Sequence, residues 1–197
     1  MIPRADNPSG RPPNMPPATS GTRPPSSPSS RWVVPPPRKC LVVGVAEMAV
    51  SNDVTAELVT YSLGSCLGIT LYDPACHVGG LLHVMLPSSE IDPAKGDRSP
   101  CMFVNTGLPR LFSAVQSLGA APARLIIKVA GGSQFLDPQG IFNIGERNQQ
   151  AVRQALTRAG YTIHGWDVGG LASRTLRLDM SNGDVSIRCP GNEIRKL

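Results

Sequence analysis

Short runs of apolar and β-branched residues recur along the chain from Cys40 onward, and they predict a strand-rich domain. Two connections between these runs carry strong turn signals, Asp73-Pro74 and Asn182-Gly183. The first of them would fold the strands over residues 67–72 and 78–86 into a hairpin, which brings the second strand back toward the start of the first. We therefore expect strands over residues 40–45, 58–61, 67–72, 78–86, 124–129, 161–168, 175–179 and 185–188.

Apolar residues at three-to-four spacing predict two main helices. The first begins near Pro109, because proline fits the first turn of a helix, and it stops at Gly119. The second spans residues 144–159 and stops at Gly160. Consecutive hairpins with interposed helices favour an α+β fold. We expect a layered α/β/β sandwich of mostly antiparallel or mixed strands.

Residues 1–38 differ in composition from the rest of the chain. They hold twelve of the twenty prolines and hardly any apolar residue before Trp32. Such a segment cannot bury enough apolar surface to offset its ordering entropy, so we expect a disordered tail followed by one domain over residues 39–197. Residues 1–39 also carry the whole net charge of +5. The neutral remainder lacks the clustered basic face that phosphate recognition needs, so no nucleic-acid partner is expected.

The N-terminal residues show no apolar segment of the signal-peptide kind, and no later run approaches the ~20 apolar residues of a membrane span. We therefore expect a cytoplasmic protein without membrane insertion. The five cysteines form no Cys-x-x-Cys pair, which favours free thiols over a disulfide framework or a cysteine-rich zinc site. Cys76 and His77 would make a poor metal site because no second pair accompanies them, and we expect no metal and no other cofactor.

A thiol and an imidazole are the candidate reactive groups. Cys66 follows a turn at Gly64-Ser65, and the predicted hairpin would bring His83 close to it. A cysteine beside a histidine is typical of a cysteine-nucleophile site, because the imidazole can accept the thiol proton. Each residue alone also has a plainer interpretation, as a small core cysteine and as a core histidine with one nitrogen satisfied.

A set of short motifs follows in one order between about residues 40 and 187. They are Thr60 with Leu63-Gly-Ser-Cys66, Tyr72-Asp-Pro74, Gly79-Gly80, His83-Val-Met-Leu-Pro87, Gly131-Gly132, Ile144-Gly-Glu-Arg-Asn148 and Asp167-Val-Gly-Gly170. Each motif alone is weak, but the ordered set resembles the chemoreceptor glutamine deamidase (CheD) family. Ser62 departs from the family pattern, which commonly has glycine there.

The resemblance implies a protein-glutamine glutaminase that converts glutamines on the cytoplasmic helices of chemotaxis receptors to glutamates, through a thioester, during adaptation. It places the nucleophile on Cys66, the base on His83 and the third catalytic residue on Thr60. We expect the Cys66 thiol to have a pKa below its usual ~8.5. We also expect Gly64 and Ser65 to support a loop whose backbone amides stabilise the oxyanion. Family members bind a CheC-type phosphatase, which is therefore a candidate partner.

Several alternatives stay open. The domain could be a non-catalytic adaptor that binds receptors or a CheC-type phosphatase, although an adaptor does not need a paired thiol and imidazole. The tail could recruit a partner with an aromatic groove or serve as a spacer. Gly131-Gly132 lacks the spacing of a dinucleotide loop, so we expect it to allow close backbone packing near the site. Arg147 and Asn148 either cap the second helix or hold the active-site loops.

Overall fold

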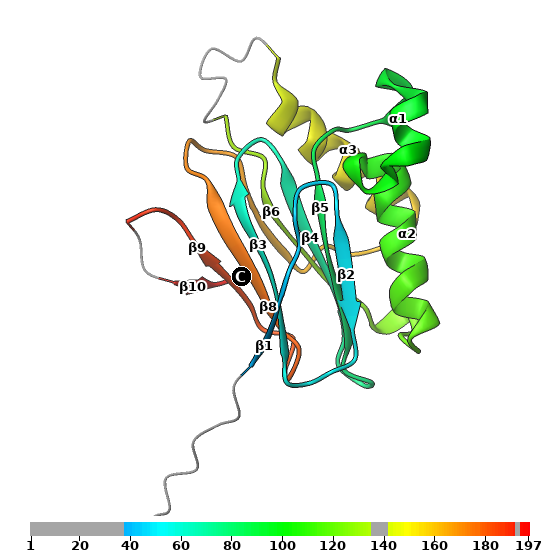
Figure 1. Ribbon diagram of the computed structural model, residues 1–197, viewed down its shortest axis with the longest axis vertical. Coiled ribbons are helices and arrows are strands. Elements are labelled where there is room, and N and C mark those ends of the chain that lie inside the picture. Colours follow the sequence, from blue (N-terminus) through cyan, green and yellow to red (C-terminus); the bar gives the residue numbers. More distant parts are fainter. Residues whose placement is uncertain (1–37, 135–141, 192–193) are drawn as a thin grey trace, which may run out of the picture. The chain divides into compact units, whose positions relative to one another are not determined.

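The computed structural model describes residues 38–134, 142–191 and 194–197, and its strands form two five-stranded sheets (Figure 1). The predicted tail lies outside these residues, apart from Arg38. The first sheet has the order β1 (Lys39–Val42), β3 (Ala56–Leu63), β8 (Arg174–Asp179), β9 (Val185–Arg188), β10 (Arg195–Lys196). The second has the order β2 (Met48–Ser51), β5 (Val78–Val84), β4 (Leu67–Asp73), β6 (Ile126–Gly131), β7 (Gly165–Val168).

Strand β4 is central in the second sheet, because it pairs antiparallel with β5 on one side and with β6 on the other. The predicted hairpin is confirmed, and its register places Gly68 opposite His83. Every residue of β4 and β5 is buried, as expected for strands that are covered on both faces. The pairs β1–β3 and β6–β7 are parallel and the other strand pairs are antiparallel, so both sheets are mixed.

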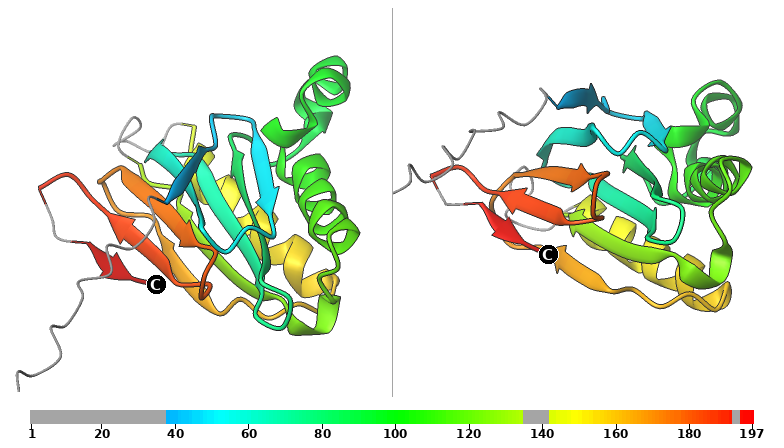
Figure 2. Two further views of the ribbon diagram at one scale, coloured as in Figure 1. Left: turned by 60° about the horizontal axis from the view of Figure 1, so that its bottom comes forward. Right: turned by 90° about the horizontal axis from the view of Figure 1, so that it is seen from below.

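Helices α2 (Val104–Ser117) and α3 (Ile144–Arg158) cover the outer face of the second sheet (Figures 1 and 2). One apolar cluster fills the space between these helices and the sheet and includes Leu82, Leu111 and Leu156. A second cluster lies between the two sheets and includes Leu81 and Leu176. Leu81 and Leu82 contribute to different clusters because successive strand residues point to opposite faces. The predicted α/β/β sandwich is confirmed.

The connections contain four shorter elements: α1 (Pro93–Arg98) and the 3-10 helices η1 (Ser89–Ile91), η2 (Pro100–Met102) and η3 (Pro122–Arg124). Helix α2 begins at Val104, five residues before the predicted start, so Pro109 lies inside it. The burial of Val104 and Leu108 on the same face as Leu111 explains the early start, because packing outweighs the weak local helix signal. The strand predicted over 161–168 begins only at Gly165, and β2 and β10 were too short to show a periodicity.

Candidate active site

Cys66 lies in the connection between β3 and β4, where the chain passes from the first sheet to the second. We call residues 62–66 the Cys66 loop. The loop begins with Ser62 in the left-handed region, at φ 56°, which explains why glycine suits this position. The N–H of Gly64 donates to the carbonyl oxygen of Ser62 at 2.8 Å. The chain thereby turns tightly between the sheets and leaves Cys66 half-buried.

Two backbone hydrogen bonds fix the Cys66 loop to the end of β6. The N–H of Gly132 donates to the carbonyl oxygen of Cys66, and the N–H of Ser133 donates to that of Gly64, both at 2.7 Å. Gly131 has a φ of 113°, and a Cβ atom there would lie 2.3 Å from the carbonyl oxygen of Cys66. The predicted role of Gly131-Gly132 in close backbone packing is confirmed.

His83 of β5 and Thr60 of β3 meet between the two sheets. Thr60 Oγ1 lies 2.7 Å from Nδ1 of His83 and donates to the carbonyl oxygen of Val43 at 2.8 Å. A hydroxyl has one proton, and here it goes to Val43, so Oγ1 accepts a hydrogen bond from the Nδ1–H of His83. The neutral imidazole therefore carries no proton on Nε2. The lone pair of Nε2 is available to act as a base.

Burial sets the charge of both reactive groups. His83 is 1 % exposed, and burial lowers its pKa to about 4, because the interior disfavours the imidazolium. Burial also raises the pKa of the Cys66 thiol, and the backbone N–H of the same residue offsets part of this effect. The prediction of a lowered thiol pKa is thus wrong for the free protein. Near pH 7 the pair consists of a neutral thiol and a neutral imidazole.

Asn148 of α3 connects the helix to both reactive segments. Its side chain is completely buried, and Nδ2 donates to the carbonyl oxygen of Ser65 at 3.0 Å and to that of Met85 at 2.7 Å. One amide therefore joins the Cys66 loop to the end of the strand that carries His83. Of the two roles open for Asn148, holding the loops is the one observed. The signal in the sequence is a polar residue in the buried stripe of α3, four residues before Val152.

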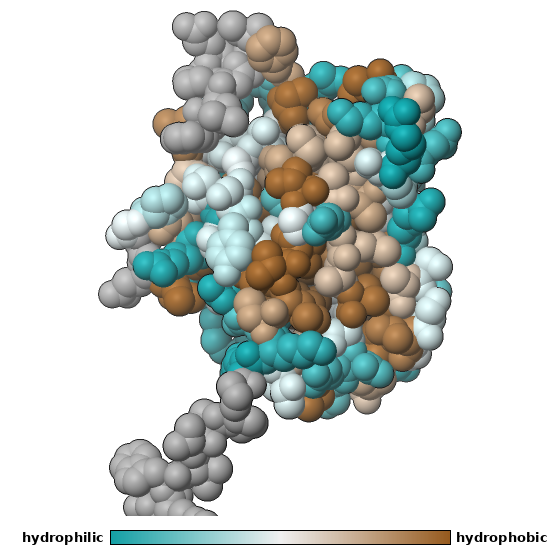
Figure 3. All heavy atoms as spheres, viewed as in Figure 1, coloured by the Kyte–Doolittle hydropathy of each residue, from teal (hydrophilic) through white to brown (hydrophobic). Residues whose placement is uncertain are grey.

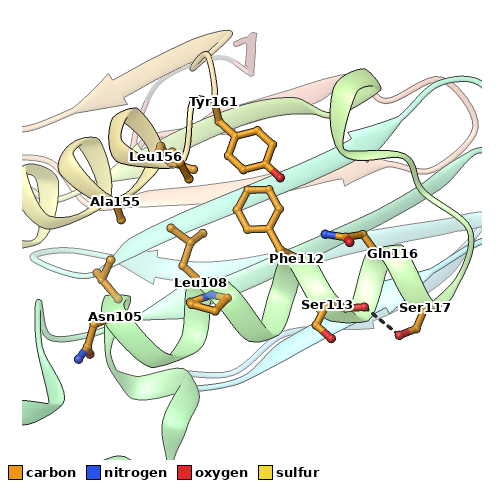
Figure 4. A pocket seen from close by; sticks show the side chains of 12 residues that line it. Asn105, Leu108, Phe112, Ser113, Gln116, Ser117, Ala155, Leu156 and Tyr161 are labelled. Atoms are coloured by element: carbon orange, nitrogen blue, oxygen red, sulfur yellow. Dashed lines mark hydrogen bonds between the residues drawn. The ribbon is translucent and has the colours of Figure 1, made fainter.

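A large cavity lies elsewhere in the described part of the chain. It has a volume of about 650 Å³ and lies between α2 and α3, where the ring of Phe112 stacks on that of Tyr161 at 4.4 Å between centroids (Figure 4). None of Thr60, Cys66 and His83 lines it. Within the described ranges no three His, Cys, Asp or Glu side chains come together to hold a metal ion. No helix in these ranges is long and apolar enough to cross a membrane.

Thr60 and His83 meet between the two sheets of the sandwich, and Cys66 lies on the connection from one sheet to the other. Cysteine-dependent hydrolases use a thiol, an imidazole and a group that orients the imidazole. Comparison with known proteins identifies the family. Residues 85–189 match the family described as CheD chemotactic sensory transduction. This match begins just after His83, so the roles of the three residues depend on their geometry.

Curated relatives extend over most of the chain, and those named here are each called a probable chemoreceptor glutamine deamidase CheD. One from Solibacter usitatus is 45 % identical over 153 residues, which cover 78 % of this chain and 90 % of that protein. One from Syntrophus aciditrophicus is 43 % identical over 157 residues, 80 % of this chain and 98 % of that protein. One from Thermococcus kodakarensis is 39 % identical over 152 residues, 76 % and 92 % of the two chains. The chain belongs to the CheD family.

Proposed function

We propose that this chain is a protein-glutamine glutaminase that converts specific glutamines of chemotaxis receptors to glutamates. The observation that carries the proposal is Nε2 of His83, which is buried and has no hydrogen-bond partner in the described part of the chain. Such an atom costs about 1–3 kcal/mol of stability, a cost that is typical of groups kept for chemistry. The names of the relatives support the substrate, since each is a probable chemoreceptor glutamine deamidase.

The reaction begins with proton transfer from the Sγ atom of Cys66 to Nε2 of His83. The thiolate attacks the carboxamide carbon of the substrate glutamine, and the resulting imidazolium returns the proton to the nitrogen as the C–N bond breaks. Ammonia leaves and a thioester remains on Cys66. A water molecule that gives a proton to His83 then attacks the thioester, which releases glutamate and restores the thiol.

Thr60 supports the charged intermediate of His83. When the imidazole becomes an imidazolium, its Nδ1–H bond to Thr60 Oγ1 becomes charge-assisted and stronger. The backbone N–H groups of Ser65 and Cys66 donate to no backbone carbonyl oxygen within the described ranges, so both can turn to the oxyanion. Because the resting pair is neutral, the thiolate forms only as the reaction starts. Thiol reagents should therefore react slowly with Cys66 when no substrate is bound.

Exposed apolar surface next to the reactive pair supports a protein substrate. The segment after β1 contacts His83 directly, since the N–H of Ala46 donates to its carbonyl oxygen at 3.0 Å. Val42, at the end of β1, and Val45, next to Ala46, are 60 % and 53 % exposed. Apolar side chains gather on the face of the molecule that Figure 3 shows. Such a surface suits one face of a receptor helix. A substrate on the cytoplasmic receptor helices places the protein in the cytoplasm, where a CheC-type phosphatase is the proposed second partner.

The test is ammonia release from receptor fragments, together with a one-dalton mass gain on the modified glutamines. We expect both signals with the wild-type chain and neither with Cys66→Ala or His83→Ala. Binding of each variant to the fragments, measured separately, serves as the folding control. Binding without ammonia release from the wild type would contradict the proposal and favour the non-catalytic adaptor.

A further inference from the structure

Three buried side-chain atoms in the described part of the chain lack a hydrogen-bond partner: His83 Nε2, Ser133 Oγ and Asn148 Oδ1. All three residues contact the Cys66 loop or the strand that follows it. Ser133 donates its N–H to the Gly64 carbonyl, Asn148 donates to that of Ser65, and His83 pairs with Gly68. Buried polar groups almost always have partners, so three exceptions around one loop indicate a polar ligand that binds there.

The chemistry of these atoms defines the ligand. Asn148 uses both Nδ2 hydrogens on carbonyl oxygens, which fixes the orientation of its amide and leaves Oδ1 as an acceptor only. The hydroxyl of Ser133 can donate or accept. A primary carboxamide offers N–H donors and one acceptor oxygen, which complements this pair. A carboxylate offers acceptors alone, and one of its oxygens would face Oδ1 without a proton between them.

A cavity lined by Ser133 has the size for a side chain. Its volume is about 150 Å³, and Ser65, Ser133, Phe142, Ile144 and Gly145 are among the residues that line it. Cavities of about this volume accept a ligand as large as benzene, and the end of a glutamine side chain is no larger. Phe142 and Ile144 supply apolar surface for the methylene groups. Ser65, which precedes Cys66 in the sequence, and Ser133 are among its polar lining residues.

We propose that Ser133 Oγ and Asn148 Oδ1 bind the primary carboxamide of the substrate, and that they distinguish it from the carboxylate of the product. This proposal rests on the proposed function for the identity of the substrate. It assigns Ser133 to binding, although nothing in the sequence pattern marks that residue. It also gives Asn148 a second role besides joining the two loops.

The variant Ser133→Ala tests the binding role separately from folding. Because the hydroxyl has no partner among the residues that the structure describes, its removal leaves the thermal midpoint unchanged or slightly higher. We expect kcat/KM for deamidation to fall about tenfold. Thr70→Val is the matched control, since it deletes a buried hydroxyl that donates to the carbonyl oxygen of Lys128 at 3.2 Å. That control lowers the midpoint and leaves kcat/KM unchanged.

Alkylation of Cys66 gives a second readout that needs no receptor. Iodoacetamide carries a primary carboxamide and iodoacetate carries a carboxylate, and peptide mass spectrometry follows each reagent at Cys66 in the full chain. Ser133→Ala should slow the reaction with iodoacetamide about tenfold and leave that with iodoacetate unchanged. Equal effects on both reagents, or wild-type kcat/KM in Ser133→Ala, would overturn the carboxamide site. A different outcome separates the two proposals. If the wild-type chain reacts with iodoacetamide faster than Ser133→Ala does but releases no ammonia from receptor fragments, the deamidase activity is refuted and the carboxamide site is retained.

Discussion

Replacing Thr60 by valine removes one hydroxyl and keeps the shape of the side chain. In the wild type, Oγ1 accepts from Nδ1–H of His83 at 2.7 Å and donates to the carbonyl oxygen of Val43 at 2.8 Å. Thr60 is 0 % exposed, so both groups stay buried without a partner in Thr60→Val. Each orphaned group costs about 1–3 kcal/mol, and we expect the free energy of unfolding to fall by about 2–4 kcal/mol.

The same variant should slow catalysis through His83. The lost bond, worth about 0.5–1.5 kcal/mol for the neutral ring, holds the tautomer whose Nε2 is unprotonated. A hydrogen bond to the imidazolium is worth about 1.5–3 kcal/mol. Since 1.4 kcal/mol corresponds to a factor of ten, we expect kcat to fall about 10- to 100-fold. KM should change little, because Thr60 does not touch the substrate.

The assay is ammonia release from receptor fragments at a temperature where circular dichroism shows the variant fully folded. Thr60→Ser is the control, because it keeps the hydroxyl and removes only the methyl group, and it should retain most of the activity. A Thr60→Val enzyme with wild-type kcat would refute the reasoning, since His83 would then need no oriented tautomer. An equal loss in Thr60→Ser would assign the effect to packing.

Three further substitutions test the geometry around the site. Gly131→Ala forces a Cβ to within 2.3 Å of the Cys66 carbonyl oxygen, so we expect the free energy of unfolding, measured by thermal unfolding, to fall by about 3 kcal/mol or more. Gly64→Ala is the control, since its Cβ would meet nothing within 4 Å and the change should be tolerated. Asn148→Ala removes the amide that links Ser65 to Met85. We expect the free energy of unfolding, measured by urea denaturation, to fall by about 2–3 kcal/mol, and kcat to fall at least about tenfold. A variant with intact kcat would show that the tie is dispensable. His83 has a pKa of about 4 when folded and ~6.5 when unfolded, so the unfolded chain binds more protons between these values, and stability is lost as the pH falls through that window. The wild type should lose roughly 3 kcal/mol of unfolding free energy through His83 between pH 7 and pH 4, and His83→Asn should not, as measured by urea titrations at both pH values. An equal loss in the two proteins would contradict this prediction.

Local signals predicted much of the fold. The turns at Asp73-Pro74 and Asn182-Gly183 join neighbouring strands, and a hairpin of known length sets its own register. That register places His83 opposite Gly68, two residues after Cys66. The start of α2 was missed because the burial of Val104 and Leu108 depends on the sheet below the helix, which no local pattern contains.

The sequence predicted candidate residues for the site but not their electrostatics. The resemblance pointed to Thr60, Cys66 and His83, and the structure brings Thr60 and His83 into contact across two sheets. The pKa of the thiol was predicted in the wrong direction, because the burial that raises the pKa of Cys66 and lowers that of His83 is a property of the packed sandwich. Nothing in the sequence pattern marked Ser133, since the burial of its hydroxyl without a hydrogen-bond partner is visible only in the folded structure.

The passage of the chain from one sheet to the other at Cys66 has a mechanical consequence. The hydroxyl of Thr60 belongs to the first sheet, the imidazole of His83 belongs to the second, and the thiol of Cys66 lies on the connection between them. Any change in the spacing of the sheets therefore alters all three relative positions at once. The turnover rate therefore depends on the distance between the sheets, which is set by apolar side chains such as Leu81 and Leu176. Selection for activity thus also selects for the thickness of the inner core.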